Sequence, residues 1–360
     1  MADHSTMVPR MTIGMDIGDT YCQVCALDAQ GEIVEEGRVR TNPEALGQRF
    51  GSATPMRIAL EVGQHSPWIS RLLSDAGHEV IVANPRKLRL IYENDRKNDR
   101  VDAQYLARLA RLDPRLLSPL PHRGVQTQRD LQILKARDLL VTSRTRLINH
   151  VRGTVKVFGL RIPKTSSGSF TTKAGGHLPP EHHSAVQPLL DLIGALTVSI
   201  RHYDRQIAQL CEQNYPQTQL LRQVTGVGPL TALTYVLILE DPHRFRSSRS
   251  VGSYVGLTRK ESRSGAHDPE LRITKAGDRN LRRLLVQSAQ YILGAFGPDT
   301  DLRRWGLVLA ARGRKNAKKR AVVAVARKLA VLLHRLWITA EVYDPLRQAA
   351  KKPRARVRAA

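Results

Sequence analysis

Residues 11–39 read MTIGMDIGDTYCQVCALDAQGEIVEEGRV, and this stretch decides the fold of the N-terminal part of the chain. Residues 12–18 and 21–28 are short apolar runs, and residues 32–39 form a third run after the turn-like DAQGE. Short apolar runs separated by turn residues are typical of consecutive strands. The stretch therefore predicts an antiparallel meander.

Beyond this meander, stretches typical of helices and strands alternate. Residues 43–52 and 66–77 predict helices, whereas 56–63 and 78–85 predict strands. Such alternation is typical of an α/β domain with a mixed sheet. We expect residues 1–115 to form this domain.

Four carboxylates stand out in it. Asp16 lies in the first apolar run, and Glu61 ends another, in RIALEVG. Residues 94–109, NDRKNDRVDAQYLARL, carry Asp99 and Asp102 three positions apart, on one face of a predicted helix. Two carboxylates on one face repel each other, so the pair indicates either a solvated surface or half of a metal site.

The four together have the pattern of a two-metal phosphodiester site. Hard cations such as Mg²⁺ take oxygen ligands, and two of them can hold both the attacking and the leaving oxygen. We therefore expect Asp16, Glu61, Asp99 and Asp102 to bind Mg²⁺, with Mn²⁺ as a substitute. The neighbouring cations Arg96, Lys97 and Arg100 are candidate phosphate contacts.

The composition indicates a polyanionic partner. The 360 residues include 57 Lys and Arg against 32 Asp and Glu, a formal net charge of +25. Nucleic acid is the most common reason for such an excess. No run approaches the roughly 20 apolar residues of a spanning helix, and the N-terminus carries no apolar signal region. We expect a cytoplasmic protein and no membrane partner.

The three cysteines predict neither disulfides nor zinc. Cys22 and Cys25 form a C-x-x-C, but they lie in a predicted strand, where residues three apart face opposite sides. Together with Cys211 they are interpreted as small buried side chains.

Residues 116–215 predict a helical arm. Residues 126–158 carry apolar side chains at helical spacing among many cations, a loop covers 159–184, and a second helix covers about 185–213. Two long helices joined by a loop predict an antiparallel coiled-coil arm. The arm would serve as a spacer, as a dimerisation element or in nucleic-acid contact.

Residues 216–345 predict a third, mostly helical domain. Gly226 and Gly228 precede an apolar helix and resemble a helix-hairpin-helix turn, whose amides can hold a phosphate. An ordinary tight helix connection explains the same residues equally well. The basic tail, residues 346–360, is expected to be disordered.

Ordered motifs run along nearly the whole chain. MDIG, ALEVG and NDRKNDRVDAQYLARL come first, and TGVGPLTA, RFRSSRSVGSYVGLT, ESRSG and ITKAGDRNLRRLLVQSA follow. In these motifs the chain resembles the DEDD transposases of bacterial insertion sequences, related to the Piv DNA invertases and described as bridge-RNA-guided recombinases. The resemblance implies a RuvC-like domain of the ribonuclease-H type, the coiled-coil arm and a mostly α C-terminal transposase domain.

The resemblance also implies a serine nucleophile. The family pattern, a Gly-Leu pair followed by Ser-Gly, falls here on Gly256-Leu257 and then on Ser264-Gly265. Ser264 is therefore the expected nucleophile, although Ser262 stands two positions away. In the last motif, Lys275, Arg279 and Arg282 are candidate nucleic-acid contacts.

The resemblance further implies a bacterial protein that is associated with the nucleoid when active, and it gives the expected partners. They are donor and target double-stranded DNA, a bridge RNA that guides the choice of sequence, and further copies of the chain in a tetramer, a dimer of dimers with composite active sites. Aromatic residues make up only 5% of the chain, too few for an extended base-stacking platform. Recognition of the DNA sequence by a guide RNA instead of by the protein is consistent with that composition.

Two other functions remain open at this point. A metal-only nuclease, such as a junction resolvase, would use the same RuvC-like carboxylates and water as its nucleophile. A non-enzymatic nucleic-acid-binding protein would carry these carboxylates on separate solvated surfaces.

Overall fold

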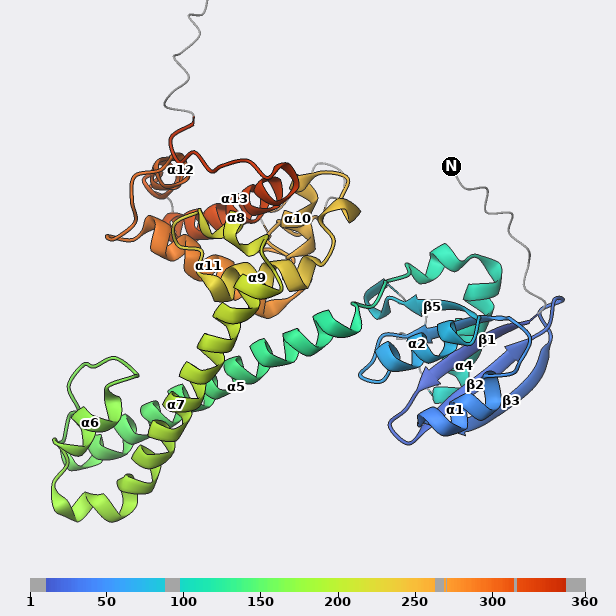
Figure 1. The fold of residues 1–360 in the computed structure, drawn as a ribbon, viewed down its shortest axis with the longest axis horizontal. Helices are drawn as coiled ribbons and strands as arrows, with labels where there is room; N and C mark the ends of the chain where they lie inside the picture. Colours follow the sequence, from blue (N-terminus) through green and yellow to red (C-terminus); the bar gives the residue numbers. More distant parts are fainter. Residues whose placement is uncertain (1–10, 88–97, 263–268, 270, 314–315, 348–360) are drawn as a thin grey trace, which may run out of the picture. The chain divides into compact units, whose positions relative to one another are not determined.

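The computed structural model describes residues 11–87, 98–262, 269, 271–313 and 316–347 (Figure 1). The chain divides into two compact units, Met1–Gly124 and Val125–Ala360. The second unit contains both the predicted arm and the predicted C-terminal helices.

A five-stranded mixed sheet forms the centre of the first unit. Its strands are β1 (Thr12–Ile17), β2 (Tyr21–Leu27), β3 (Ile33–Arg40), β4 (Arg57–Glu61) and β5 (Glu79–Ala83), in the order β3-β2-β1-β4-β5. Strands β1, β2 and β3 form the predicted antiparallel meander, whereas β4 pairs in parallel with β1 and β5. The predicted α/β class and mixed sheet are confirmed.

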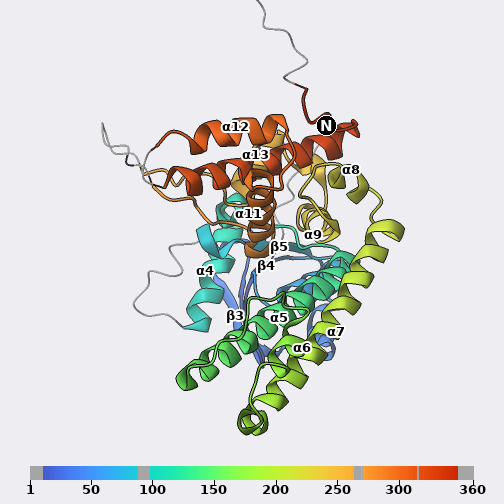
Figure 2. The ribbon, with the colours of Figure 1, turned by 90° about the vertical axis from the view of Figure 1, so that its left-hand side faces the viewer.

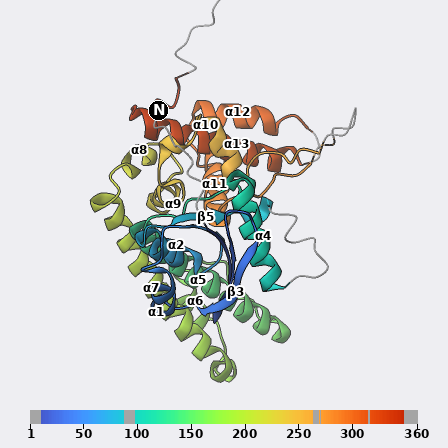
Figure 3. The ribbon, with the colours of Figure 1, turned by 90° about the vertical axis from the view of Figure 1, so that its right-hand side faces the viewer.

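Helices cover both faces of this sheet, as Figure 3 shows. Helices α1 (Pro43–Phe50) and α2 (Ser66–Asp75) lie on one face, and their apolar side chains share a cluster with alternate residues of β1 and β4. Helix α4 (Asp99–Leu112) lies on the other face. Short 3-10 turns at Pro85–Lys87 and Pro114–Leu117 complete the unit.

Helix α4 lies directly against the backbone of β1. A Cβ atom at Gly14 would come within 1.9 Å of the Ala103 carbonyl oxygen and within 2.5 Å of the Ala107 nitrogen. Only glycine allows this approach, and the small side chains of Ala103 and Ala107 complete it. The position of α4 on the sheet is therefore tightly constrained.

The cysteines lie as predicted. Cys22 and Cys25 belong to apolar clusters on opposite faces of β2, and Cys211 is buried in the second unit. All three are free thiols. Burial raises the pKa of each thiol, which keeps them in the neutral form.

Two long antiparallel helices, α5 (Val125–Thr154) and α7 (His183–Gln213), form the predicted arm. Arg137 forms an ion pair with Asp204 at 2.6 Å, and Arg144 donates to Thr197 at 3.2 Å. As the residue number rises along α5, that of its partner on α7 falls, so the two helices are antiparallel. The predicted loop 159–184 is partly helical. It contains α6 (Phe170–Gly175) and a 3-10 turn at Pro180–His182, after another such turn at Val155–Phe158.

Sequence pattern missed helix α6 because its anchor is tertiary. Phe170 and Ala174 are fully buried in a cluster at the tip of the arm, together with Val151 and Ile193. One apolar residue per turn in a Ser/Thr/Gly-rich segment carries too little periodicity to predict a helix.

One helical stretch, Pro180–Gln213, is long and apolar enough to span a membrane by length and composition alone. It carries Pro188 in its interior, and Val186, Leu190 and Ile193 are buried against the rest of the arm tip. A core helix passes the same test, so this stretch is weak evidence for a membrane segment.

The C-terminal helices share a core with the base of the arm. They are α8 (Thr218–Arg222), α9 (Pro229–Leu239), α10 (Ser248–Tyr254), α11 (Arg279–Leu293), α12 (Asp301–Ala310) and α13 (Ala317–Thr339), with a 3-10 turn at Pro242–Arg244. Figure 2 shows α12 and α13 side by side. Helix α9 is buried on all sides from Thr231 to Leu239, and the Tyr235 hydroxyl donates to the Ala330 carbonyl at 2.7 Å.

The base of the arm is fixed to this core by apolar and polar contacts. Leu134 of α5 and Ile207 of α7 belong to the same buried cluster as α9. The Tyr215 hydroxyl donates to the buried carboxylate of Asp130 at 2.5 Å. Burial, reinforced by Asp130, raises the pKa of Tyr215, so the phenol remains a donor at neutral pH.

Candidate acidic site and C-terminal loop

Strands β1 and β4 bring Asp16 and Glu61 to neighbouring positions. In the parallel ladder Met15 lies opposite Leu60, and the two carboxylates each follow by one residue. Side chains two apart on a strand face the same side. Gly14 faces α4, and Ala59 packs in the cluster that contains α4 residues, so Asp16 and Glu61 lie on the α4 face.

The N-terminus of α4 lies at the same end of the sheet. The Arg57 guanidinium, at the start of β4, donates to the Ala110 carbonyl at 3.1 Å near the C-terminus of α4. Ala103 lies against Gly14 in the middle of β1. Helix α4 therefore runs opposite to β1 and β4, and its first turn lies near the carboxyl ends of both strands.

This first turn carries the other two carboxylates. Asn98 caps the helix by accepting from the Val101 amide at 2.9 Å, and Asp99 and Asp102 follow it. Asp102 is only 6% exposed, whereas Asp99 is exposed. The partial positive charge of a helix N-terminus stabilises both carboxylates. A shared cation is therefore not the only way to relieve the repulsion between them.

The backbone thus brings the elements that carry all four predicted ligands to one corner of the sheet. Four carboxylates offer only oxygen, the donor that hard divalent cations prefer. As the side chains lie, no group of three or more His, Cys, Asp or Glu residues within the described part of the chain is placed to hold a metal ion. Asp16, Glu61 and Asp102 each make other interactions. The ligand cluster stays a prediction.

Of the three predicted phosphate contacts beside this corner, Arg96 and Lys97 lie outside the described residues. Arg100 forms an ion pair with Glu36 of β3, and Gln104 donates to the same carboxylate. Hydrogen bonds from Arg100 and then Gln104 hold the pKa of Glu36 below its usual value. In this arrangement Arg100 ties α4 to the edge of the sheet.

The Gly226-Val227-Gly228 turn joins α8 to α9. Gly226 has a φ of +91°, and Gly228 is extended and directly precedes Pro229, the first residue of α9. The Gly228 carbonyl accepts the first helical hydrogen bond, from the Ala232 amide at 3.0 Å. This connection fits both the helix-hairpin-helix turn and an ordinary tight helix connection, and phosphate binding by these amides stays a prediction.

The expected nucleophile, Ser264, lies outside the described residues, but the segments on both sides of it form a short paired stem. The Thr274 amide donates to the Thr258 carbonyl at 2.9 Å, and Lys260 donates to Arg272 at 2.9 Å. At the base of the stem Gly256 has a φ of +71°, and a Cβ there would lie 2.2 Å from the Ala276 carbonyl oxygen. Ser262, at the far end, is exposed.

The stem brings two of the sequence motifs together. Gly256 belongs to RFRSSRSVGSYVGLT, and Ala276 belongs to ITKAGDRNLRRLLVQSA, so the two motifs meet at this base. Arg282 donates to the carbonyls of Val255 and Ala276 at 3.1 and 2.6 Å, and thereby fixes both strands. The sequence predicted Arg282 as a nucleic-acid contact, whereas the structure gives it this positioning role.

Two other candidate contacts in that motif are exposed. Lys275 has a φ of +55° beside the stem, and Arg279 begins helix α11 after the Asp278 cap. Their contact with nucleic acid stays a prediction.

Two family models match the chain, the first over the segment with the acidic site and the second over the segment with the C-terminal loop. A model for the DEDD transposase domain of the IS110 type, described as a transposase, matches residues 13–159, and a model described as "Transposase IS116/IS110/IS902 family" matches residues 218–302. Both models describe transposases, and the chain is similar to transposases of this type over most of its length. The first match contains all four carboxylates, and the second contains Ser264.

Several relatives of this transposase match along most of their length, and another matches over less than half. The transposase for insertion sequence element IS1111A of Coxiella burnetii is 28% identical over 347 residues, which cover 92% of this chain and 90% of the relative. The transposase for insertion sequence element IS1328 of Yersinia enterocolitica is 28% identical over 301 residues, 79% of this chain and 84% of the relative. A pilin gene-inverting protein of Moraxella lacunata is 29% identical over 136 residues, 36% of this chain and 41% of its own.

These matches confirm the expectation of an enzyme of the transposase class, which acts on DNA. The relation to invertases is limited to the partial match with the pilin gene-inverting protein.

Proposed function

We propose that this transposase cleaves and rejoins the DNA of its insertion sequence through a covalent phosphoserine intermediate at Ser264, assisted by the acidic quartet. The observation that carries the proposal is the convergence of β1, β4 and the N-terminus of α4, which brings the elements bearing Asp16, Glu61, Asp99 and Asp102 to one corner of the sheet.

The four carboxylates would hold Mg²⁺, or Mn²⁺ in its place, which supplies charge stabilisation at the phosphodiester when bound. Asp102, buried in the first turn of α4, is the most constrained of these ligands. Because Asp102 is fixed, the other three carboxylates would have to orient toward it to share an ion.

Ser264 carries the transferable bond. Its Oγ attacks phosphorus, a bond between Oγ and phosphorus forms, the bond from phosphorus to the leaving sugar oxygen breaks, and that oxygen takes up the proton that the serine loses. A new strand hydroxyl reverses the exchange and frees the serine. Because the number of phosphoester bonds is conserved, strands are joined without ATP, whereas attack by water would only cut.

The remaining parts of the proposal rest on the family resemblance and on charge. Donor and target DNA bind a chain of net charge +25, a bridge RNA selects the sequences, and a tetramer assembled as a dimer of dimers brings quartet and serine from different copies together. The paired arm helices α5 and α7 offer the element through which copies associate.

A pair of serine variants tests the mechanism. With Mg²⁺, guide RNA and labelled DNA, we expect Ser264→Ala to assemble the complex but to lose both cleavage and joining. Ser262→Ala, two positions away, is the matched control and should retain both. Cleavage by Ser264→Ala at nearly the normal rate would support attack by water and the metal-only nuclease instead.

A further inference from the structure

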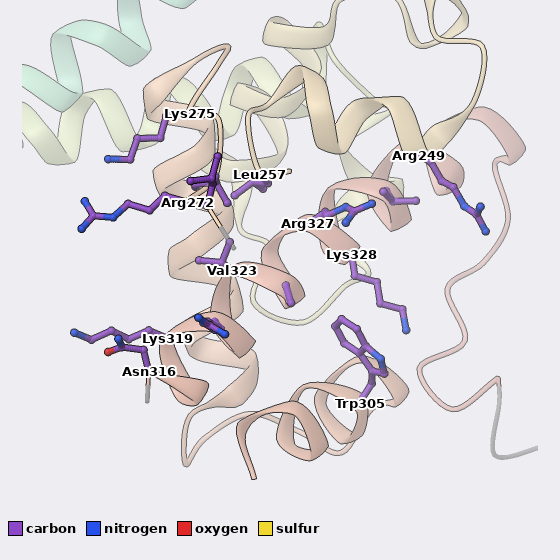
Figure 4. A pocket seen from close by; sticks show the side chains of 15 residues that line it. Arg249, Leu257, Arg272, Lys275, Trp305, Asn316, Lys319, Val323, Arg327 and Lys328 are labelled. Carbon is purple, nitrogen blue, oxygen red and sulfur yellow. The ribbon is translucent and has the colours of Figure 1, made fainter. Parts of the chain in front are cut away.

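A cavity of about 1050 Å³ opens among the C-terminal helices, separate from the acidic corner. It lies between α10, α12, α13 and the stem, with Arg249, Trp305, Lys319 and Leu257 contributed by these four elements in turn (Figure 4). The volume is at the upper end of the range for small-molecule sites, so it is large enough for a nucleotide.

The lining is cationic at the rim. Seven of the fifteen residues around this cavity are Lys or Arg, and none is Asp or Glu. Arg272, Lys319 and Arg327 are exposed and make no ion pair with any residue that the structure describes. Elsewhere in the same unit arginines are paired, for example Arg304 with Asp299 at 2.5 Å.

Unpaired like charges around one concavity destabilise the free protein, and a polyanion relieves that repulsion. Long, exposed side chains are the usual ligands of phosphate oxygens. The rim therefore points to phosphates as one part of the ligand.

The floor of the cavity is apolar. Leu257 and Val323 lie between the two sides of the rim, and Trp305 lies at one end (Figure 4). Ile273 also lines the cavity. The Lys328 ammonium stands 4.3 Å from the centre of the Trp305 ring. Phosphates gain nothing from such a floor, whereas the flat face of a nucleobase gains both apolar contact and stacking.

We propose that this cavity binds an unpaired nucleotide within a nucleic-acid strand, with its base on the apolar floor beside Trp305 and the flanking phosphates on Arg272, Lys319 and Arg327. The proposal relies on the proposed function only for the class of polymer. A base inside an intact duplex cannot reach the floor, so the cavity selects unstacked RNA or DNA over the continuous double helix.

A charge-matched pair of variants tests the rim. The double variant Arg272→Gln/Lys319→Gln removes two rim cations, and Arg312→Gln/Lys318→Gln removes two exposed cations that do not line the cavity. Binding of labelled single strands to the full chain is measured by anisotropy against salt, without divalent cation.

We expect the rim variant to bind at least tenfold more weakly, with a log-log salt slope shallower by roughly 1.4, or about 0.7 for each of two phosphates. The Arg312→Gln/Lys318→Gln control should lose much less. Equal losses in the two double variants, or none in the rim variant, would overturn the site.

A second measurement tests the base. Wild type should bind a strand about tenfold more tightly than the same strand with abasic positions, and Trp305→Leu, checked for an unchanged melting profile, should lose this difference. RNA and DNA strands are compared, and a preference for either supports the site and identifies its strand. If the rim variant weakened duplex binding as much as single-strand binding, the proposal that the cavity binds an unpaired nucleotide would be wrong.

Neither measurement requires strand transfer. The serine mechanism and this cavity therefore succeed or fail separately.

Discussion

The transposase concentrates like charges in two places, the acidic corner of the first unit and the basic cavity of the second, and it holds them differently. The acids are carried by strand ends and by a helix turn whose position is set by backbone contact at Gly14. The cavity cations extend on long exposed side chains from α10, α13 and the stem. A small ion of defined coordination needs fixed ligands, whereas a polymer of variable conformation is best met by mobile ones.

Among the substitutions that test the contrast between the acidic corner and the basic cavity, the largest effect is expected at Asp102. Replacing it with Asn removes one charge from the corner while preserving shape, and several kcal/mol of lost transition-state stabilisation corresponds to roughly a thousandfold slower strand cleavage. Cleavage of DNA carrying the element ends, in Mg²⁺, measures the rate.

Asp75→Asn is the control for Asp102→Asn, because Asp75 ends α2 at an exposed position in the same unit. It should leave the rate unchanged. Equal rates for the two variants would place Asp102 outside the reaction.

The second effect concerns the framework that positions the acids. Gly14→Ala forces its Cβ against the Ala103 carbonyl, and overpacking of this kind costs about 1–3 kcal/mol of unfolding free energy. Denaturant unfolding measures the loss, and cleavage should fall with it because α4 must shift.

Gly37→Ala on β3 provides the matched control, since nothing lies within 4 Å of its added Cβ. A stability loss in Gly37→Ala as large as in Gly14→Ala would show that α4 does not lie against β1 as described.

The smallest effect is expected at Glu36, whose ion pair with Arg100 contrasts with the unpaired cations of the cavity. Glu36 stabilises the fold through Arg100, and its lowered pKa means that the folded state holds its proton less tightly than the unfolded state. This contribution is therefore complete above the usual pKa of 4.5 and is lost as pH falls through the folded value.

Glu36→Gln should lower the melting temperature by a few degrees at most at pH 7, because the Arg100 side chain is largely exposed and solvent screens its charge. The difference should vanish in acid. Thermal unfolding of both proteins at a series of pH values measures this. A difference that grew as pH fell would contradict the assignment.

Much of the fold could be predicted from the sequence because its signals are local. The three strands of residues 11–39, the alternation after them and the helices of the arm all follow from periodicity and turn residues. Helix α6 was missed because Phe170 and Ala174 find their apolar partners only in the tertiary structure.

The candidate site divides in the same way. The residue types Asp, Glu, Asp and Asp at strand ends and on a helix predicted oxygen ligands, but the orientation of α4 depends on Gly14 and on the Arg57 contact, which no local pattern encodes. Of the basic cavity only Lys275 was predicted as a nucleic-acid contact, since Arg249, Arg272 and Lys319 lie in separate elements that meet only on folding.

The central claim is that one reaction uses both the acidic quartet and Ser264, and the covalent intermediate tests it most directly. Wild type is incubated with Mg²⁺, guide RNA and labelled DNA, denatured and digested, and the labelled peptide is identified by mass spectrometry, with Asp102→Asn in parallel. We predict label on a peptide of residues 260–272, at Ser264, and almost none in Asp102→Asn. Cleaved DNA with no label on any serine, or full labelling in Asp102→Asn, would contradict the account.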